Sequence, residues 1–260
     1  MQRGVRTEAR LWRRLDLEAG EAGLPEWAHR AFRRFGGDVE SSAPLFPCVF
    51  GAEAFRADGL RFVFVEGDED PDDLEELAQA LAQFVRRSRG FGRYVSLVAF
   101  FGPPEEEREL ADWEQAFWRV LQLLHDHDVE PWPDEIPMDP EQDYWEFCFA
   151  GTPMFVVCNT PSHGRRRSRS GAGLTITFQP RWVFEGLEGD SIAGKNARRT
   201  IRARIDRYDA LPPSPRLGVY GAPGNREWQQ YFLPDDNATT PRDRCPLHIV
   251  GENGEGGVTS

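Results

Sequence analysis

The feature that most constrains the fold is an alternation of apolar runs and helix patterns in the first half of the chain. The runs at 60–67 (LRFVFVEG) and 94–102 (YVSLVAFFG) are rich in Val and Phe, and each suits one buried strand. Between them, Asp70 and Pro71 predict the start of a helix, because Asp caps and Pro fits the first helical position. The segment after the second run carries the clearest apolar stripe, made by Leu110, Trp113, Phe117, Val120, Leu121 and Leu124.

Later strand patterns follow one another without helices of that kind between them. WEFCFAGTPMFVVCN (145–159) predicts a hairpin, and GLTITFQP (173–180) predicts a further strand. Strands that first alternate with helices and later follow one another favour a single α+β domain with a mixed or antiparallel sheet flanked by helices. We expect a helical arm at 1–40, a main domain at 41–250 and a disordered tail at 251–260.

Three smaller expectations complete the organisation. Trp27, Phe32 and Phe35 are the predicted contacts by which the arm docks on the domain. A short helix, AEAFRAD, is predicted directly after Cys48, and a basic helix at 191–208.

The predicted hairpin determines where two cysteines point. With Gly151-Thr152 as a two-residue turn, Cys148 faces Phe155 and Trp145 faces Cys158. Because side chains alternate along a strand, Cys148 and Cys158 then project from opposite faces of the sheet. We therefore expect them neither to form a disulfide nor to share a metal.

Composition excludes several classes of protein. The chain has 260 residues with 18 Phe and 8 Trp, which excludes disorder as a state of the whole chain. A net charge of −12 disfavours general nucleic-acid binding. No stretch approaches the roughly 20 apolar residues of a membrane span, and the N-terminus lacks the apolar core of a signal peptide. We expect a cytoplasmic protein whose cysteines are reduced unless they hold a metal.

Familiar catalytic motifs are missing, so single residues must be weighed one by one. Cys245 and His248 are three apart with no second pair beside them, which favours chance over a zinc site. Cys48 follows Pro47 at the start of a short helix, where the helix N-terminus lowers a thiol pKa and suits a thiolate ligand or a reactive thiol. The alternative is that Cys48 is a small buried residue in a tight loop.

A strongly basic segment follows the hairpin. CNTPSHGRRRSRSG (158–171) places His163 in a loop beside Arg165, Arg166, Arg167 and Arg169. From residue 161 to residue 207 the chain has eleven Lys or Arg and four acids. Neighbouring arginines repel one another unless an anion neutralises them, which predicts an anionic small ligand. A mobile basic loop without a ligand and an RNA-binding loop are the alternatives.

Two further blocks mix aromatic and polar residues. FQPRWVFEGL (178–187) and NREWQQYFLPDDN (225–237) have the composition of a pocket with an apolar body and a few oriented polar groups. An ordinary half-buried surface has the same composition.

Together with FPCVFG (46–51), PWPDEIPMDP (131–140) and WEFCFAGTPMFVVCNTPSH (145–163), these blocks resemble the YqcI/YcgG family of bacterial proteins. The resemblance extends from about residue 43 to about residue 246. It implies a haem-dependent N-oxygenase of a natural-product pathway, which hydroxylates a guanidine or amine nitrogen of a small molecule such as L-arginine. It further implies haem b, O₂ or H₂O₂ as oxidant, and an electron donor that the sequence does not identify.

Haem chemistry assigns expected roles to particular residues. The expected axial ligand is Cys48 or His163, and we favour Cys48 because thiolate ligation promotes O–O cleavage. Cys158 is a weaker thiolate candidate, and Cys148 and Cys245 rank below it. The arginines after His163 are expected to neutralise the haem propionates, and Arg181 and Trp182 to contact the cofactor. For a guanidinium substrate the candidate carboxylates are Glu146 and Glu227. The alternative function is a haem-binding or redox-sensing protein without turnover.

Overall fold

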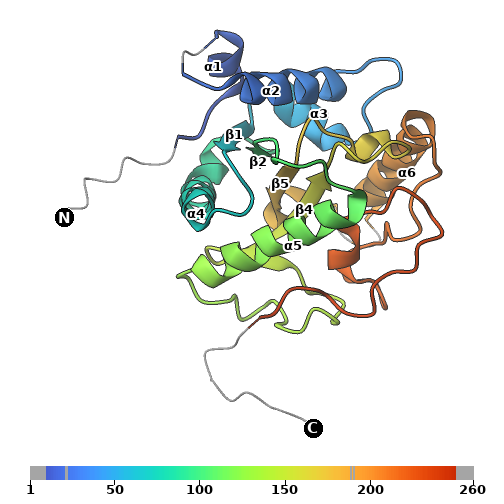
Figure 1. Cartoon of the computed structure of the whole chain (residues 1–260). Coiled ribbons are helices and arrows are strands. Elements are labelled where there is room, and N and C mark those ends of the chain that lie inside the picture. The colour runs from blue at the N-terminus through green and yellow to red at the C-terminus, as the bar shows by residue number, and fades with distance from the viewer. Residues whose placement is uncertain (1–9, 21–22, 188, 190, 250–260) are drawn as a thin grey trace.

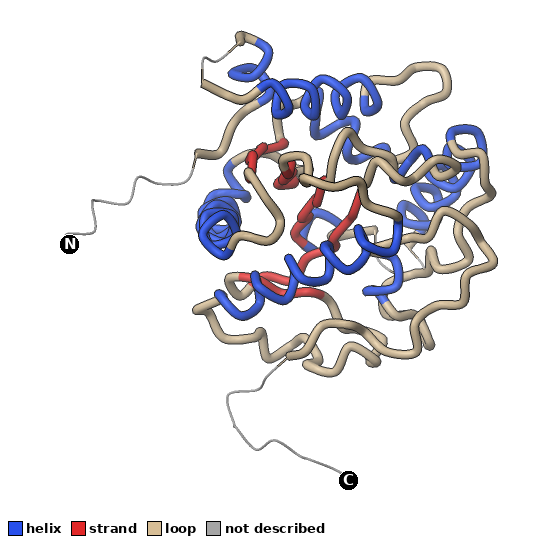
Figure 2. The backbone as a smooth tube through the Cα atoms, in the orientation of Figure 1, coloured by secondary structure: helices blue, strands red, loops and turns tan. Residues whose placement is uncertain are grey.

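A mixed five-stranded sheet lies at the centre of the fold (Figures 1 and 2). The computed structural model describes residues 10–20, 23–187, 189 and 191–249. The strands are β1 (Leu60–Val65), β2 (Ser96–Phe101), β3 (Phe147–Phe149), β4 (Thr152–Asn159) and β5 (Thr175–Pro180). Their order is β1-β2-β5-β4-β3, with β1 and β2 parallel and the other pairs antiparallel. The predicted α+β class with a mixed sheet is confirmed.

Two long helices pack on one face of this sheet. Helix α4 (Pro71–Arg87) makes the crossover that a parallel pair requires, and α5 (Leu110–His127) lies beside it. Asp70 begins α4 as predicted, because its carboxylate accepts the N–H of Asp72 at 2.9 Å. The apolar stripes of both helices and alternate residues of the strands form the larger of two hydrophobic clusters.

The opposite face of β1 and β2 is covered by the N-terminal helices. Helix α2 (Glu26–Val39) and α3 (Val49–Arg56) pack there, preceded by the short α1 (Arg14–Glu18). Ring centroids lie 5.2 Å apart for Phe32 and Phe62, and 5.7 Å apart for Phe35 and Phe100. The ring of Trp27 meets Phe64 at 6.1 Å, so all three predicted docking contacts are confirmed.

The corresponding face of β4 and β5 is left partly open. Along β4, Met154, Val156 and Cys158 are fully buried, whereas the residues between them are half-buried. Because side chains alternate, the half-buried residues all point away from α4 and α5. Helix α6 (Ile192–Tyr208) borders this side, and its N-cap Ser191 accepts the N–H of Gly194 at 3.0 Å.

The hairpin turn lies one residue earlier than predicted. Ala150 and Gly151 both have positive φ, 49° and 65°, as a type I′ turn requires. Cys148 therefore pairs with Pro153, not with Phe155, and Trp145 precedes β3, so its predicted pairing with Cys158 was wrong. The two registers differ by an even number of residues, so each keeps Cys148 and Cys158 on opposite faces. All four cysteines are free.

Short 3₁₀ segments connect the main elements: η1 (Ser88–Gly90), η2 (Arg167–Arg169), η3 (Arg181–Phe184) and η4 (Glu227–Gln230). The predicted tail at 251–260 lies outside the described residues. Within the part of the chain that is described, no helix combines the length and the apolar character needed to cross a membrane.

Candidate functional site

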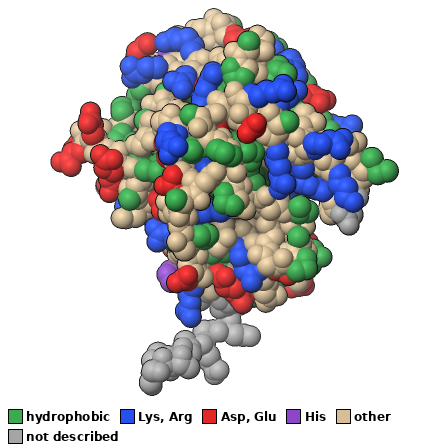
Figure 3. All heavy atoms as spheres, turned by 90° about the vertical axis from the view of Figure 1, so that its right-hand side faces the viewer, with side chains coloured by type: hydrophobic (Ala, Val, Ile, Leu, Met, Phe, Trp, Pro, Cys, Tyr) green, Lys and Arg blue, Asp and Glu red, His purple; other side chains and the backbone are tan. Residues whose placement is uncertain are grey.

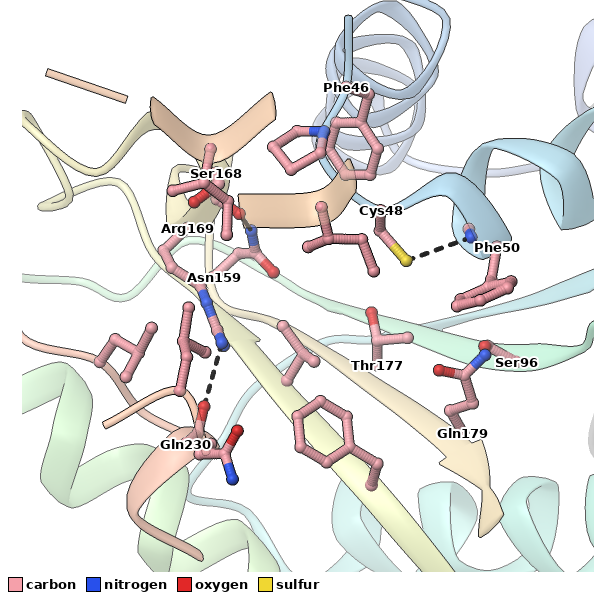
Figure 4. A pocket seen from close by; sticks show the side chains of 18 of the residues that line it. Phe46, Cys48, Phe50, Ser96, Asn159, Ser168, Arg169, Thr177, Gln179 and Gln230 are labelled. Carbon is pink, nitrogen blue, oxygen red and sulfur yellow. Dashed lines mark hydrogen bonds between the residues drawn. The ribbon is translucent and has the colours of Figure 1, made fainter. Parts of the chain in front are cut away.

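A cavity of about 370 Å³ occupies the open side of β4 and β5, between the sheet, α3 and α6 (Figure 4). This volume lies within the range of small-molecule sites, roughly 300–1,000 Å³. Apolar side chains such as Phe46, Phe50, Val157 and Phe184 make most of the wall.

The floor of this pocket is polar where it is made by the central strand β5. Thr175, Thr177 and Gln179 line the cavity, while Ile176 and Phe178 point into the core beneath α4 and α5. Sequence reasoning missed Thr175 and Thr177 as part of a site, whereas Gln179 belongs to the block at 178–187 that was predicted to have the composition of a pocket. The signal was present in TITFQ, because a central strand with a polar residue at every second position has one polar face.

Cys48 lies in the wall of the pocket at the start of α3. It is the N-cap residue, and its Sγ accepts the N–H of Gly51 at 3.2 Å. Figure 4 shows the sulfur on the side of the cavity across from Thr177. Burial raises the pKa of the Cys48 thiol and outweighs the helix N–H groups, Arg169 and Arg204, which lower it. The expectation of a net lowered pKa was therefore wrong, because desolvation exceeds the effect of the helix terminus.

His163 lies away from the pocket and its ring nitrogens are both engaged. Nδ1 is 2.8 Å from the hydroxyl of Thr160, and Nε2 is 2.8 Å from the carbonyl of Leu233. Only 2% of the residue is exposed, and burial lowers the pKa of His163 to about 4. The imidazole is thus neutral at physiological pH and connects the basic loop to the chain segment of Leu233. Cys48 and His163 are not brought together.

The remaining thiols are not pocket groups. Cys158 lies on the α4/α5 side of β4 and is fully buried, and Cys148, within β3, is also buried. Burial raises the pKa of both thiols. In the described ranges, no three His, Cys, Asp or Glu side chains come together as a metal-binding group.

The arginines that follow His163 occupy different environments. Arg165 is exposed, Arg167 pairs with Asp38 at 3.2 Å, and Arg166 bonds the carbonyl of Pro234 and the side chain of Asn237. Arg169 is buried. Of the four, Arg166, Arg167 and Arg169 line the cavity.

Acidic residues of the chain itself supply part of the negative charge that was predicted to accompany the arginine-rich segment. Asp235 accepts the backbone N–H groups of Gly164, Arg165 and Arg166, at 2.6–3.0 Å for the closest contact of each. Asp209 accepts the N–H of Ser168 at 2.7 Å. The loop is therefore ordered by carboxylates from distant parts of the chain.

The two candidate carboxylates meet on one arginine. The Nε of Arg181 donates to Glu146 at 2.5 Å, and its terminal nitrogen contacts both Glu146 and Glu227, the latter at 3.0 Å. Tyr220 stacks on the guanidinium with 3.7 Å between the Arg181 Cζ and the ring centroid. Arg181 and Glu227 line the pocket, whereas Glu146 lies behind them.

The charges at this end of the pocket do not cancel. Two carboxylates share one guanidinium, so the Glu146–Arg181–Glu227 group has a surplus of negative charge when ionised. Burial raises the pKa of Glu227, opposed by Arg181 and Asn225. Trp182, next to Arg181, points elsewhere and packs beneath the guanidinium of Arg89, at 4.8 Å from the ring centroid.

Basic side chains gather on the α6 side of the molecule (Figure 3). From this helix, Arg198 and Arg202 line the cavity, and Arg34 of α2 reaches it from the other side. The pocket thus combines an apolar body, a thiol, a polar floor and a cationic border.

Fold and pocket together define an α+β protein with a largely apolar cavity of ligand size. The chain belongs to the YqcI/YcgG family, whose model matches residues 37–248. It is 44% identical to YcgG, an uncharacterized protein of Bacillus subtilis, over 237 residues that cover 90% of this chain and 93% of that protein. YqcI of the same organism is 41% identical over 240 residues, 91% of this chain and 94% of its own length.

A relative from Streptomyces lavendulae has a functional name. DcsA, named a putative N(omega)-hydroxy-L-arginine synthase, is 37% identical over 236 residues, which cover 88% of this chain and 86% of DcsA. No solved structure matches the chain.

Proposed function

We propose that this protein is a haem-dependent N-oxygenase that hydroxylates a guanidine or amine nitrogen of a small molecule such as L-arginine. The observation that carries the proposal is the position of Cys48, a thiol in the wall of a largely apolar pocket, beneath the first N–H groups of a helix. The name of DcsA supports the substrate class and the reaction type.

The chemistry of the residues around the pocket supports the proposal of a haem. Cys48 would ligate the iron, and the Gly51 N–H would remain on the sulfur, where such hydrogen bonds tune a thiolate ligand. The cationic border, from Arg34, Arg167, Arg198 and Arg202, would neutralise the propionates. When bound, the haem supplies oxygen activation, which no side chain of the chain can supply alone.

His163 is the poorer candidate ligand on the same geometric grounds. Both of its ring nitrogens have partners within the fold, and it does not line the cavity. Ligation by His163 would require breaking a bond to Thr160 or Leu233 and moving a buried ring.

The chain's own residues would bind and orient the substrate. The floor residues Thr177 and Gln179 offer hydrogen bonds on the side of the pocket across from Cys48. Glu227, held by Arg181, offers negative charge to a cationic guanidine or amine. In the peroxide-driven reaction, one oxygen atom of H₂O₂ enters an N–H bond to give N–OH and the other leaves as water.

The test compares spectra and products of matched variants. Wild-type protein reconstituted with haemin should show a Soret band, a ferrous–CO band at the red-shifted position typical of thiolate, and N-hydroxylated product from L-arginine with peroxide or a reductase. C48S should lose the thiolate signature, while C148S, which removes a buried thiol outside the pocket, should retain it. If H163Q loses the native spectrum and C48S retains it, the assignment of Cys48 is wrong.

Two other results would contradict the wider proposal. A protein that takes up no haemin is not a haem enzyme. Haem binding without product from any guanidine or amine would favour the alternative of a haem-binding sensor.

A further inference from the structure

The side chain of Arg169 has no counter-ion within the described residues. Its Nη1 donates to the carbonyl of Tyr231 and its Nη2 to the carbonyl of Gln230, each at 3.0 Å. Only 7% of the residue is exposed, and it lines the cavity. Figure 4 shows the side chain extending alongside Asn159 towards Gln230.

Two bonds to carbonyl oxygens leave most of the donors of this guanidinium unused. Arginine carries five N–H groups, and two are accounted for here. No carboxylate in the described part of the chain is within ion-pair distance of Arg169, in contrast to Arg181, which contacts two. An unpaired buried charge is costly, and folds retain one where an anion completes it.

Arg169 remains a cation in the folded protein. Burial lowers the pKa of Arg169 to about 10, which still leaves it protonated at neutral pH. Arg166 repels it, and Asp209, Cys158 and Cys48 are the groups that attract it. Asp209 is already engaged by Ser168, and burial raises the pKa of both thiols.

A negative group of the same pocket is linked to Arg169 through one residue. The carbonyl of Gln230 accepts from Arg169, and its side-chain Nε2 donates to Glu227 at 3.1 Å. Glu227 belongs to the group that has two carboxylates and one arginine. The pocket therefore has a positive wall at Arg169 and a negative wall at Glu227, on either side of Gln230.

We infer that Arg169 binds the carboxylate of the substrate, so that the pocket selects guanidino or amino carboxylic acids over the corresponding decarboxylated amines. This inference rests on the proposed function for the presence of a guanidine or amine substrate. A substrate with a carboxylate at one end and a cationic group at the other is complementary to the two walls.

The test is a comparison of two probes by isothermal titration calorimetry on the full chain, with and without haemin. L-Arginine carries the carboxylate, and agmatine is the same guanidine without it. Since a hydrogen bond to a charged group contributes more than a neutral one, we expect wild type to bind L-arginine roughly 10- to 100-fold more tightly than agmatine.

Three variants of buried arginines locate the origin of this preference. R169Q should bind both probes alike, with the affinity for agmatine unchanged. R169K, which keeps the charge but loses the planar fork, should keep part of the preference, and it also serves if R169Q is unstable. R61Q is the matched control, because Arg61 is likewise buried and bonded only to carbonyls, of Asp58 and Leu60, but does not line the cavity.

The outcomes separate this inference from the proposed function. Equal affinities in wild type, or a preference that persists in R169Q and R169K, would overturn it even if haem binds and arginine is hydroxylated. If R169Q loses haemin binding but still prefers L-arginine to agmatine, Arg169 binds a haem propionate. That result would overturn the inference as well. A preference that depends on Arg169 in a protein without haem would support it while the proposed function fails. If neither probe binds, the inference is refuted, while haemin uptake and product formation from other guanidines or amines still decide the proposed function.

Discussion

Replacement of Arg181 by methionine tests the most densely charged part of the fold. The guanidinium contacts two carboxylates, and Glu146 is fully buried while Glu227 is 4% exposed. Methionine retains much of the volume but removes the only guanidinium that contacts both carboxylates in the described structure. Breaking a buried ion pair from one side costs about 3–5 kcal/mol, because the remaining charge stays buried without its partner. For a domain of this size the melting temperature should fall by roughly 6–20 °C.

The pH dependence of this loss has a definite sign. Burial already raises the pKa of Glu227 and Arg181 opposes that rise, so R181M should raise the pKa further. A carboxyl group whose pKa is higher in the folded state destabilises the fold above its unfolded pKa, and the loss is relieved as the pH falls through the folded pKa. The deficit of R181M should therefore be smaller near about pH 5 than near about pH 8.

Urea unfolding at both pH values, followed by tryptophan fluorescence, measures this effect. The double variant E227Q/R181M is the control, because it removes one of the orphaned charges and should recover part of the stability. A loss below about 1 kcal/mol, the level of an exposed ion pair, would show that these three groups are not buried together and refute the reasoning.

Two further predictions concern buried titratable groups. The pKa of His163 is lowered from 6.5 to about 4, so the neutral ring stabilises the fold fully above pH 6.5 and loses that contribution, ~3 kcal/mol in all, as the pH falls towards 4. In H163Q the free energy of unfolding, measured in urea, should therefore decline less steeply with falling pH than in wild type. Equal slopes in the two proteins would contradict this prediction. Iodoacetamide followed by mass spectrometry should modify the half-buried Cys48 and Cys245 before the buried Cys148 and Cys158, and early labelling of Cys158 would contradict the position of β4.

Local patterns were sufficient to predict the elements of this fold. The Asp70-Pro71 start, the apolar stripe of α5 and the strands at 60–65 and 96–101 follow from capping chemistry and periodicity, which depend only on neighbouring residues. The turn of the hairpin was misplaced because Ala150 adopts a positive φ. Such a turn is normally indicated by Asn-Gly or Asp-Gly, and Ala-Gly gives no such signal.

The site could be predicted only in part. The resemblance to the family named Glu146, Arg181 and Glu227 as functional candidates but did not predict their contact, because they come from segments 35 and 46 residues apart. The same limit applies to His163, whose ring nitrogen reaches Leu233 across 70 residues. The pKa of Cys48 depends on burial by the surrounding fold, which its local sequence does not contain.

Within the six residues of the central strand β5, core packing constrains some positions and ligand binding constrains the others. Its backbone pairs with β2 on one side and β4 on the other, so the positions of its side chains are fixed by the sheet. Ile176 and Phe178 serve the core, while Thr175, Thr177 and Gln179 face the cavity. Exchanges at the cavity-facing positions can thus change which molecules fit without disturbing the core beneath. Relatives with different substrate preferences should diverge at these odd-numbered positions and keep the even-numbered ones apolar.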